Sequence, residues 1–100
     1  MTNAELLIDL IKDGQKLVAD ARKQRTTDYE SRCAAWAKRV EFALQNDAVD
    51  LVRFWEAERS TNVEPRIPNT IMRDWQMTRG RLVLLIEIAR ERQDTRSPRS

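Results

Sequence analysis

Arg81-Leu82-Val83-Leu84-Leu85-Ile86-Glu87-Ile88-Ala89 lies within the longest predicted helix, from about Pro68 to Asp94, and is apolar around most of the helix circumference. On a wheel of 3.6 residues per turn, one face of this helix carries Ile71, Trp75, Leu82, Ile86 and Ala89. The opposite side carries Met77, Gly80, Leu84 and Ile88. A helix that is apolar on two faces is normally surrounded by protein, either in its own domain or against a partner.

The same periodicity predicts three further helices, at about residues 3–25, 27–45 and 48–59, and one loop at residues 60–68. Thr2 with Glu5, and Thr27 with Glu30, have capping-box spacing at the first two helix starts. Short connections favour antiparallel neighbours. We therefore predict an all-α fold, a compact four-helix bundle with one short helix and mostly antiparallel neighbours. Residues 1–94 form the bundle domain, and residues 95–100 form a basic flexible tail.

The apolar stripes identify the side chains that we expect in the core. In the second helix these are Tyr29, Cys33, Trp36, Val40 and Leu44. The short third helix, capped by Asp47, is expected to bury Leu51, Val52 and Trp55, with Phe54 on its flank. Gly14 lies in the middle of the apolar face of the first helix, where it costs up to ~1 kcal/mol of helix propensity relative to Ala. This position therefore predicts the close approach of another helix.

Composition indicates one globular domain. The 100 residues are 41% apolar and 34% charged, with a formal net charge of +2. No apolar run approaches the ~18 residues that a membrane span requires, and no basic region followed by an apolar stretch marks a secretory signal. A single cysteine, Cys33, excludes an internal disulfide and favours a reducing environment. We therefore expect a cytoplasmic protein that does not span a membrane.

Catalysis is disfavoured by the residue types present. The chain has no histidine, which removes the commonest general base and zinc ligand. Cys33 falls on a core face one turn from Trp36, where an inert buried thiol is expected rather than a nucleophile. The acidic residues are explained as helix caps and solvated surface. We therefore expect no enzyme, and we assign no catalytic, cofactor-binding or metal-binding residue.

The tryptophans and the second apolar face of the 68–94 helix are the candidate interaction features. Trp36 and Trp75 have core spacing, whereas Trp55 is either a core residue or a partly exposed anchor for a partner. The second apolar face is covered either by the chain's own helices or by another chain. We assign partner binding to Met77, Gly80, Leu84, Ile88 and Trp55. The partner is another protein or a second copy of this chain, and a symmetric homodimer is the simplest closed form.

The C-terminal third carries the one cue to nucleic acid. Residues 65–100 contain eight arginines and four acidic residues. Six of these eight arginines lie in the C-terminal part of this region and carry the cue: Arg79, Arg81, Arg90, Arg92, Arg96 and Arg99. However, the 60–68 loop is longer than the turn of a helix-turn-helix motif, and cations near a helix C-terminus also complement the helix dipole. A small nucleic-acid-associated regulator that uses this basic region is therefore the alternative to a non-catalytic protein-interaction or assembly module.

The order of the core residues along the chain forms a recognisable series. Leu10-Ile11-Lys12-Asp13-Gly14-Gln15-Lys16-Leu17 is similar to a leading L-I-x-x-G-x-x-L helix. It is followed by Tyr29 through Trp36, Val40, Leu44, Phe54 and then Gly80-Arg81-Leu82 before a terminal apolar helix. This series, which covers most of residues 6–90, resembles a small helical module of bacteria that is found fused ahead of TIR-type and related nucleotide-sensing effector domains, and also alone. The resemblance implies an accessory or adaptor module of phage-defence signalling that has no activity of its own.

Overall fold

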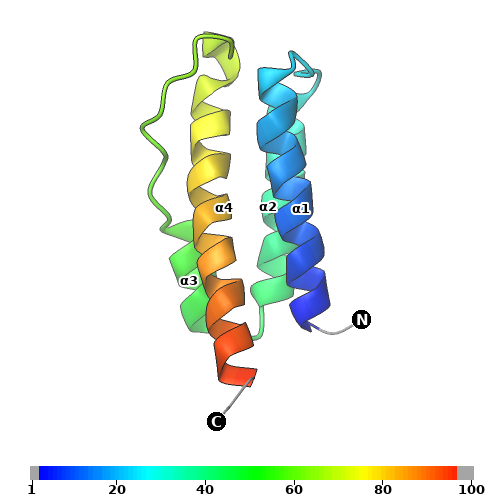
Figure 1. The fold of residues 1–100 in the computed structure, drawn as a ribbon, viewed down its shortest axis with the longest axis vertical. Helices are drawn as coiled ribbons and strands as arrows, with labels where there is room; N and C mark the ends of the chain where they lie inside the picture. Colours follow the sequence, from blue (N-terminus) through cyan, green and yellow to red (C-terminus); the bar gives the residue numbers. More distant parts are fainter. Residues whose placement is uncertain (1–2, 97–100) are drawn as a thin grey trace.

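The chain folds into four helices, with no strand in residues 3–96, the part that the computed structural model describes (Figure 1). Side chains are described for residues 5–92. The helices are α1 (Asn3–Arg22), α2 (Tyr29–Leu44), α3 (Ala48–Trp55) and α4 (Asn69–Arg96). The predicted all-α fold with one short helix is confirmed.

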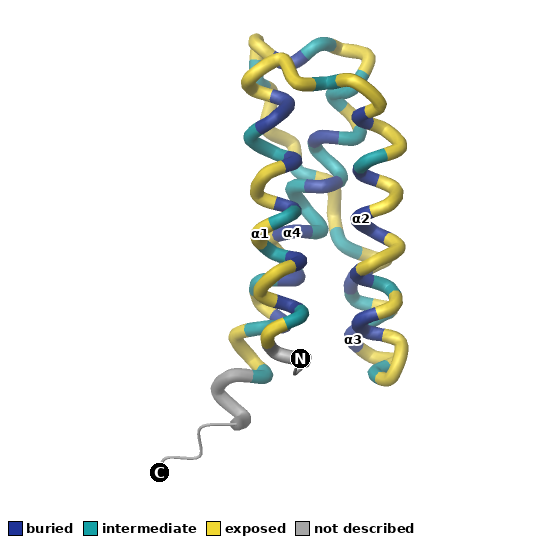
Figure 2. Tube along the Cα trace, turned by 90° about the vertical axis from the view of Figure 1, so that its right-hand side faces the viewer, coloured by how far each residue is buried: buried dark blue, intermediate teal, exposed yellow. Residues whose placement is uncertain are grey.

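The helices pack into an elongated bundle with extents of 47 × 22 × 22 Å. α1 and α2 form an antiparallel pair on one side of α4, and α3 lies on the other side, beside the C-terminal half of α4 (Figure 1). Figure 2 shows that the buried positions of each helix face the interior of the bundle. α4 contacts all three other helices, and every contacting pair except α2 and α4 runs antiparallel. The predicted arrangement of mostly antiparallel neighbours is confirmed.

Trp36 of α2 occupies the centre of the core and is 2% exposed. Its ring lies over Gly14 of α1, where a Cβ atom would be 2.8 Å from Trp36 Cζ2 and 2.9 Å from Leu82 Cδ1. The indole Nε1 donates a hydrogen bond to the carbonyl oxygen of Leu10 at 2.7 Å, which satisfies the polar atom of a buried ring. Gly14 is therefore tightly covered, but by an indole ring and a leucine side chain of the neighbouring helices, and not by the backbone of another helix.

The connecting segment, residues 56–68, runs back along α4 in an extended form (Figure 1). α3 ends beside the C-terminal half of α4, so the chain must return along the bundle before α4 begins. Thirteen extended residues span roughly 43 Å, whereas thirteen helical residues would span only about 20 Å. The amide of Ser60 donates to the carbonyl of Gln76 at 3.0 Å, and the Gln76 side chain donates to the carbonyl of Asn62 at 2.8 Å. These bonds fix the connecting segment on α4.

The start of α2 differs from the prediction. The Thr27–Glu30 capping box is wrong, because α2 begins at Tyr29 and its N-cap is Asp28, whose side chain makes no capping hydrogen bond. Asp28 has φ 52°, and Gln24 at the other end of the turn has φ 64°. The chain therefore reverses between α1 and α2 through two left-handed residues, a conformation that aspartate tolerates better than most residues.

Other helix ends also shift. α3 ends at Trp55 instead of about Arg59, because only an extended chain covers the distance back to the start of α4. α4 begins as predicted after Pro68 and continues to Arg96, two residues beyond the predicted end. Thr2 of the first predicted capping box, and residues 97–100 of the predicted tail, lie outside the described residues.

Gly80→Ala should destabilise the fold, since a Cβ at this position of α4 would collide with the carbonyl oxygen of Glu58 in the connecting segment. Backbone yields less readily than a flexible side chain, so we expect the free energy of unfolding to fall by about 1–3 kcal/mol. This loss should occur although Ala raises helix propensity by about 1 kcal/mol. Urea melts followed by circular dichroism measure the change.

Ser31→Ala, at an exposed position of α2, is the control and should be neutral or slightly stabilising. A Gly80→Ala variant with a higher urea midpoint than wild type would contradict the close contact between the connecting segment and α4.

Candidate interaction surface

The second apolar face predicted for α4 is covered in large part by the chain itself. The connecting segment passes over Gly80, where a Cβ would also lie 3.4 Å from the Cα of Arg59. Ile88 is 0% exposed and belongs to the core, so its assignment to partner binding is wrong. Met77 and Leu84 are half-buried, and Leu84 packs against the core. α4 is therefore a central helix, and the surface that it leaves for a partner is confined to a groove.

α3 has an apolar outer face. Phe54 is 0% exposed and Asp50 is 8% exposed, so these two residues define its buried side. Val49, Val52 and Trp55 are 70%, 51% and 39% exposed. These three residues recur every third position along one side of the helix, and we refer to them as the α3 stripe. The prediction that Val52 is buried with Phe54 on the flank is wrong, because Phe54 faces the core and Val52 faces outward.

Trp55 is held in place at the edge of the α3 stripe. Its ring lies edge-on to Phe54, with centroids 5.5 Å apart, and the guanidinium carbon of Arg81 is 4.8 Å from its ring centroid. Burial lowers the pKa of Arg81, and its Nε has no acceptor among the described residues. Cation–π contacts with the rings of Trp55 and Phe54 therefore stabilise the Arg81 cation beside α3. A partly exposed, immobilised tryptophan is typical of an interface anchor, which favours the exposed alternative for Trp55.

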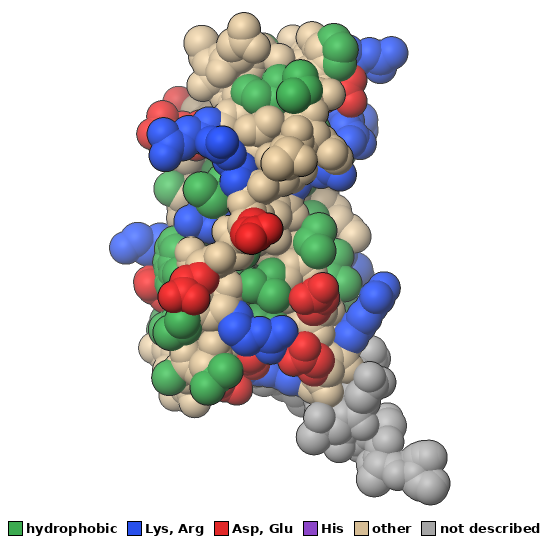
Figure 3. Space-filling view, turned by 90° about the vertical axis from the view of Figure 1, so that its left-hand side faces the viewer, with side chains coloured by type: hydrophobic (Ala, Val, Ile, Leu, Met, Phe, Trp, Pro, Cys, Tyr) green, Lys and Arg blue, Asp and Glu red, His purple; other side chains and the backbone are tan. Residues whose placement is uncertain are grey.

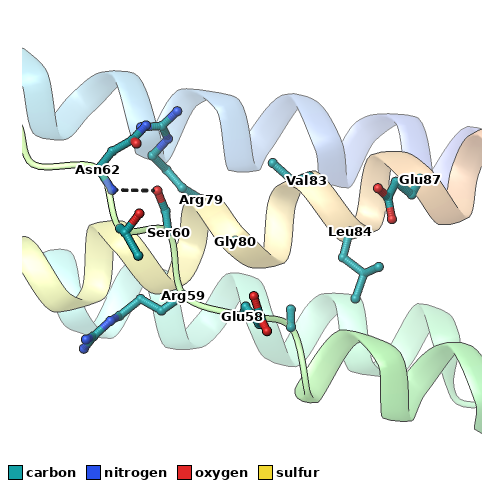
Figure 4. A pocket seen from close by; sticks show the side chains of 11 residues that line it. Glu58, Arg59, Ser60, Asn62, Arg79, Gly80, Val83, Leu84 and Glu87 are labelled. Carbon is teal, nitrogen blue, oxygen red and sulfur yellow. Dashed lines mark hydrogen bonds between the residues drawn. The ribbon is translucent and has the colours of Figure 1, made fainter.

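A groove of about 560 Å³ lies between the connecting segment and α4, and we refer to it as the α4 groove (Figure 4). Val83, which is 58% exposed, and Leu84 provide its apolar part. Leu84 points from α4 toward α3 in Figure 4. Glu58, Glu87 and Arg79 line the same groove. The groove therefore combines an apolar floor with charged groups of both signs.

The face that carries α3 and the connecting segment is shown in Figure 3. Hydrophobic side chains occur at several places on this face, interspersed with acidic and basic side chains. The α3 stripe and the α4 groove adjoin each other here, because Ala57 and Glu58 line the groove and follow α3 directly. The apolar side chains of this face therefore lie among charges of both signs.

Ion pairs with α4 hold α3 in this orientation. Asp50 accepts hydrogen bonds from Arg92 and Arg53, each at 3.0 Å. Arg53 also donates to both carboxylate oxygens of Glu91, at 2.8 and 2.9 Å. Asp47 caps α3 as predicted, because its carboxylate accepts from the amide of Asp50 at 3.1 Å. We refer to these groups as the α3 latch, which turns one apolar side of α3 inward and leaves the α3 stripe outside.

The α3 latch also shifts the titration of its carboxylates. The hydrogen bond from the Asp50 amide is the largest cause that lowers the pKa of Asp47, and the nearby Arg92 adds to it. The hydrogen bonds from Arg53 lower the pKa of Glu91. Both carboxylates are therefore held in the ionised form that the latch requires.

Arginines of the basic C-terminal third are engaged within the fold. The guanidinium carbon of Arg79 lies 5.0 Å from the ring centroid of Trp75. When the side-chain oxygen of Asn62 faces Arg79, the Arg79 guanidinium donates a hydrogen bond to this oxygen at 3.2 Å. Arg81 stacks on the rings beside α3, and Arg92 belongs to the α3 latch. Arg90 is exposed. The side chains of Arg96 and Arg99 lie outside the described residues.

Cys33 is a buried free thiol, and burial raises its pKa. The protonated thiol is a poor nucleophile. Within the described residues, no three histidine, cysteine or carboxylate side chains lie close enough together to hold a metal ion. None of the helices in that part of the chain has the length and apolar character needed to cross a membrane. Comparison with protein-family models, curated proteins and solved structures gives no match.

The stability that the α3 latch contributes should be lost in acid. Because the folded-state pKa values of Asp47 and Glu91 are lowered, their ionised forms stabilise the fold at neutral pH. This contribution disappears as the pH falls below about 4, through the folded pKa values. Arg53→Gln removes the cation from Glu91, so its Tm should fall less steeply than that of wild type between about pH 6 and about pH 3. Thermal melts followed by circular dichroism measure both slopes.

Arg59→Gln makes the same change in net charge and is the matched control, since Arg59 forms no ion pair with the described residues. It should keep the wild-type slope. Equal slopes for all three proteins would show that the α3 latch does not stabilise the fold.

Proposed function

We propose that this chain is a non-catalytic protein-interaction or assembly module whose binding face is the α3 stripe together with the α4 groove. The exposed α3 stripe is the observation that carries the proposal. Val49 and Val52 are more than half exposed on a helix that is held rigidly by ion pairs. Clustered apolar side chains of this kind on an ordered helix mark interaction sites. A helix that is already ordered also loses little conformational freedom on binding.

The groups around the α3 stripe support a protein partner. Trp55 and Arg81 are immobilised against each other, and tryptophan and arginine are the residue types that most often anchor interfaces. Val83 and Leu84 extend the apolar area into the α4 groove. The charged groups that line this groove would form a polar rim.

The proposed face keeps part of the partner-binding set predicted from sequence. Trp55 and Leu84 lie on it, and Gly80 lines the α4 groove through its backbone. Met77 is half-buried on α4 and does not line the groove. Val49, Val52 and Val83 are additions that depend on how α3 is oriented.

The nucleic-acid alternative is less well supported. Arg79, Arg81 and Arg92 already contact aromatic rings or carboxylates of their own chain, so fewer cations are available for phosphates. The resemblance to modules that accompany nucleotide-sensing effectors suggests a setting for the proposed function. An accessory of phage-defence signalling needs a face for another protein, and the α3 stripe would provide it.

A photocrosslinking residue tests this function directly. With p-benzoylphenylalanine in place of Val52, cells that express the chain should yield a discrete covalent adduct with one protein, identified by mass spectrometry. A second change, Val49→Glu, should abolish that adduct because it places a charge in the apolar contact. The same crosslinker in place of Val63, which is 74% exposed in the connecting segment, is the matched control. Adducts that are identical at both positions would contradict the proposal, and crosslinks to nucleic acid would favour the alternative.

A further inference from the structure

A second uncovered surface lies between α1 and α2. Leu6, Leu10 and Phe42 line an apolar pocket of about 330 Å³ between these helices. Phe42 is 68% exposed, so an aromatic ring stands on the outside of α2 beside this pocket. Figure 2 looks onto α1 and α2, with α4 behind them.

A cationic pocket of about 240 Å³ continues this surface along the same two helices, and Arg39 lines both pockets. The cations along the two pockets are Lys16, Arg32, Lys38 and Arg39. The two arginines pair with Asp20 and Asp13 of α1. The two lysines form no ion pair with the described residues. We refer to the two pockets together as the α1/α2 groove, which carries one unpaired lysine in each pocket: Lys38 beside Phe42 in the apolar pocket, and Lys16 in the cationic pocket.

Acidic groups that are complementary to these lysines follow the α3 stripe. Val49 and Val52 lie on the exposed side of α3, and Glu56 comes directly after the last residue of this helix. Glu58 follows in the connecting segment. Glu56 and Glu58 are both exposed and form no ion pair with the described residues. This edge of the chain is therefore apolar at the start of α3 and acidic at its end.

We propose that the α1/α2 groove binds the α3 stripe of a second copy of this chain. The valines of one copy occupy the apolar pocket beside Phe42 of the next, and Glu56 pairs with Lys16. This inference rests on the proposed function, because it uses the same binding face, and it adds the identity of the partner and the surface that receives it.

The spacing of the groups supports this register. Val49 and Glu56 are seven positions apart in the sequence. Phe42 is also seven positions from Ala35, which lines the cationic pocket together with Lys16. Each interval corresponds to roughly 10 Å along a helix. The valines can therefore lie at Leu6 and Phe42 while Glu56 lies at Lys16. Glu56 and Glu58 are opposite in charge to Lys16 and Lys38 of the α1/α2 groove, which favours association of the two surfaces.

The two surfaces lie on different sides of the molecule. Figure 1 places α3 on one side of α4 and the α1/α2 pair on the other. A contact between unlike surfaces is heterologous, so each copy can bind one neighbour through its α3 stripe and another through its α1/α2 groove. The assembly grows head to tail past the dimer, instead of closing as a symmetric pair.

Sedimentation velocity of two complementary variants tests this arrangement. Phe42→Glu blocks the α1/α2 groove and keeps the α3 stripe, whereas Val52→Glu does the reverse. Wild type should show a sedimentation coefficient that rises with concentration past the dimer value, up to about 1 mM. Each variant alone should stay monomeric over the same range, because association is weakened by about tenfold or more. An equimolar mixture should form a dimer and nothing larger, since one intact groove then meets one intact stripe.

Two matched controls place the same charge on other exposed apolar positions. Ile8→Glu on α1 and Val63→Glu in the connecting segment, which alter residues that are 44% and 74% exposed, should both assemble as wild type does. Circular dichroism melts verify that all four variants are folded.

Charge reversal tests the register: Glu56→Lys should prevent assembly, and combining it with Lys16→Glu should restore it.

Each other outcome has a defined meaning. A wild-type dimer that persists in Phe42→Glu would overturn the head-to-tail contact, since the α1/α2 groove would then take no part. Wild type that remains monomeric up to about 1 mM would overturn self-assembly. A crosslink from position 52 to a different protein would in that case still support the proposed function, so the two failures are distinguishable.

Discussion

The fold depends on burying α4, a long helix that is apolar around most of its circumference. Only three other helices and one extended segment of the described chain are available to cover it. α1 and α2 cover the side that carries Trp75 and Leu82. The other side is covered by α3 along the C-terminal half of α4 and by the extended connecting segment along its N-terminal half (Figure 1). That segment lies so close to α4 that Gly80 has no room for a Cβ. Burial of α4 on both sides supplies the apolar contacts that stabilise this small domain.

With α4 covered in this way, only one of the two apolar sides of α3 packs against the core, and the other side stays exposed. The helix is eight residues long and is fixed by Arg53 and Arg92, whose carboxylate partners lie at its start and on α4. Phe54 faces the core and the α3 stripe faces outward. The same arrangement places Trp55 at the edge of the exposed side, against Arg81. The core thus determines which residues are available to a partner, and the proposed function follows from how α4 is covered.

Helical periodicity predicted the features that depend on a single helix. It identified the fold class, the core positions of Trp36 and Trp75, and the tight packing at Gly14, because each is recorded in the spacing of apolar residues along one element. The exposed side of α3 could not be predicted in this way, since Val52 and Phe54 lie on two sides of a helix that are both apolar. The choice depends on Arg92, which is 42 residues from Asp50 in the sequence. For the same reason Ile88 was assigned to a partner although the chain's own core buries it.

Native-state hydrogen exchange tests most directly whether α4 is buried by its own chain. The amides of α4 between Trp75 and Ile88 should be among the slowest to exchange, and should exchange only through global unfolding. Their protection should be the same in dilute and in concentrated protein, because no second chain is needed to cover them. Protection of these amides that appears only at high concentration, or their exchange through a smaller opening than that of the α2 amides, would contradict this account.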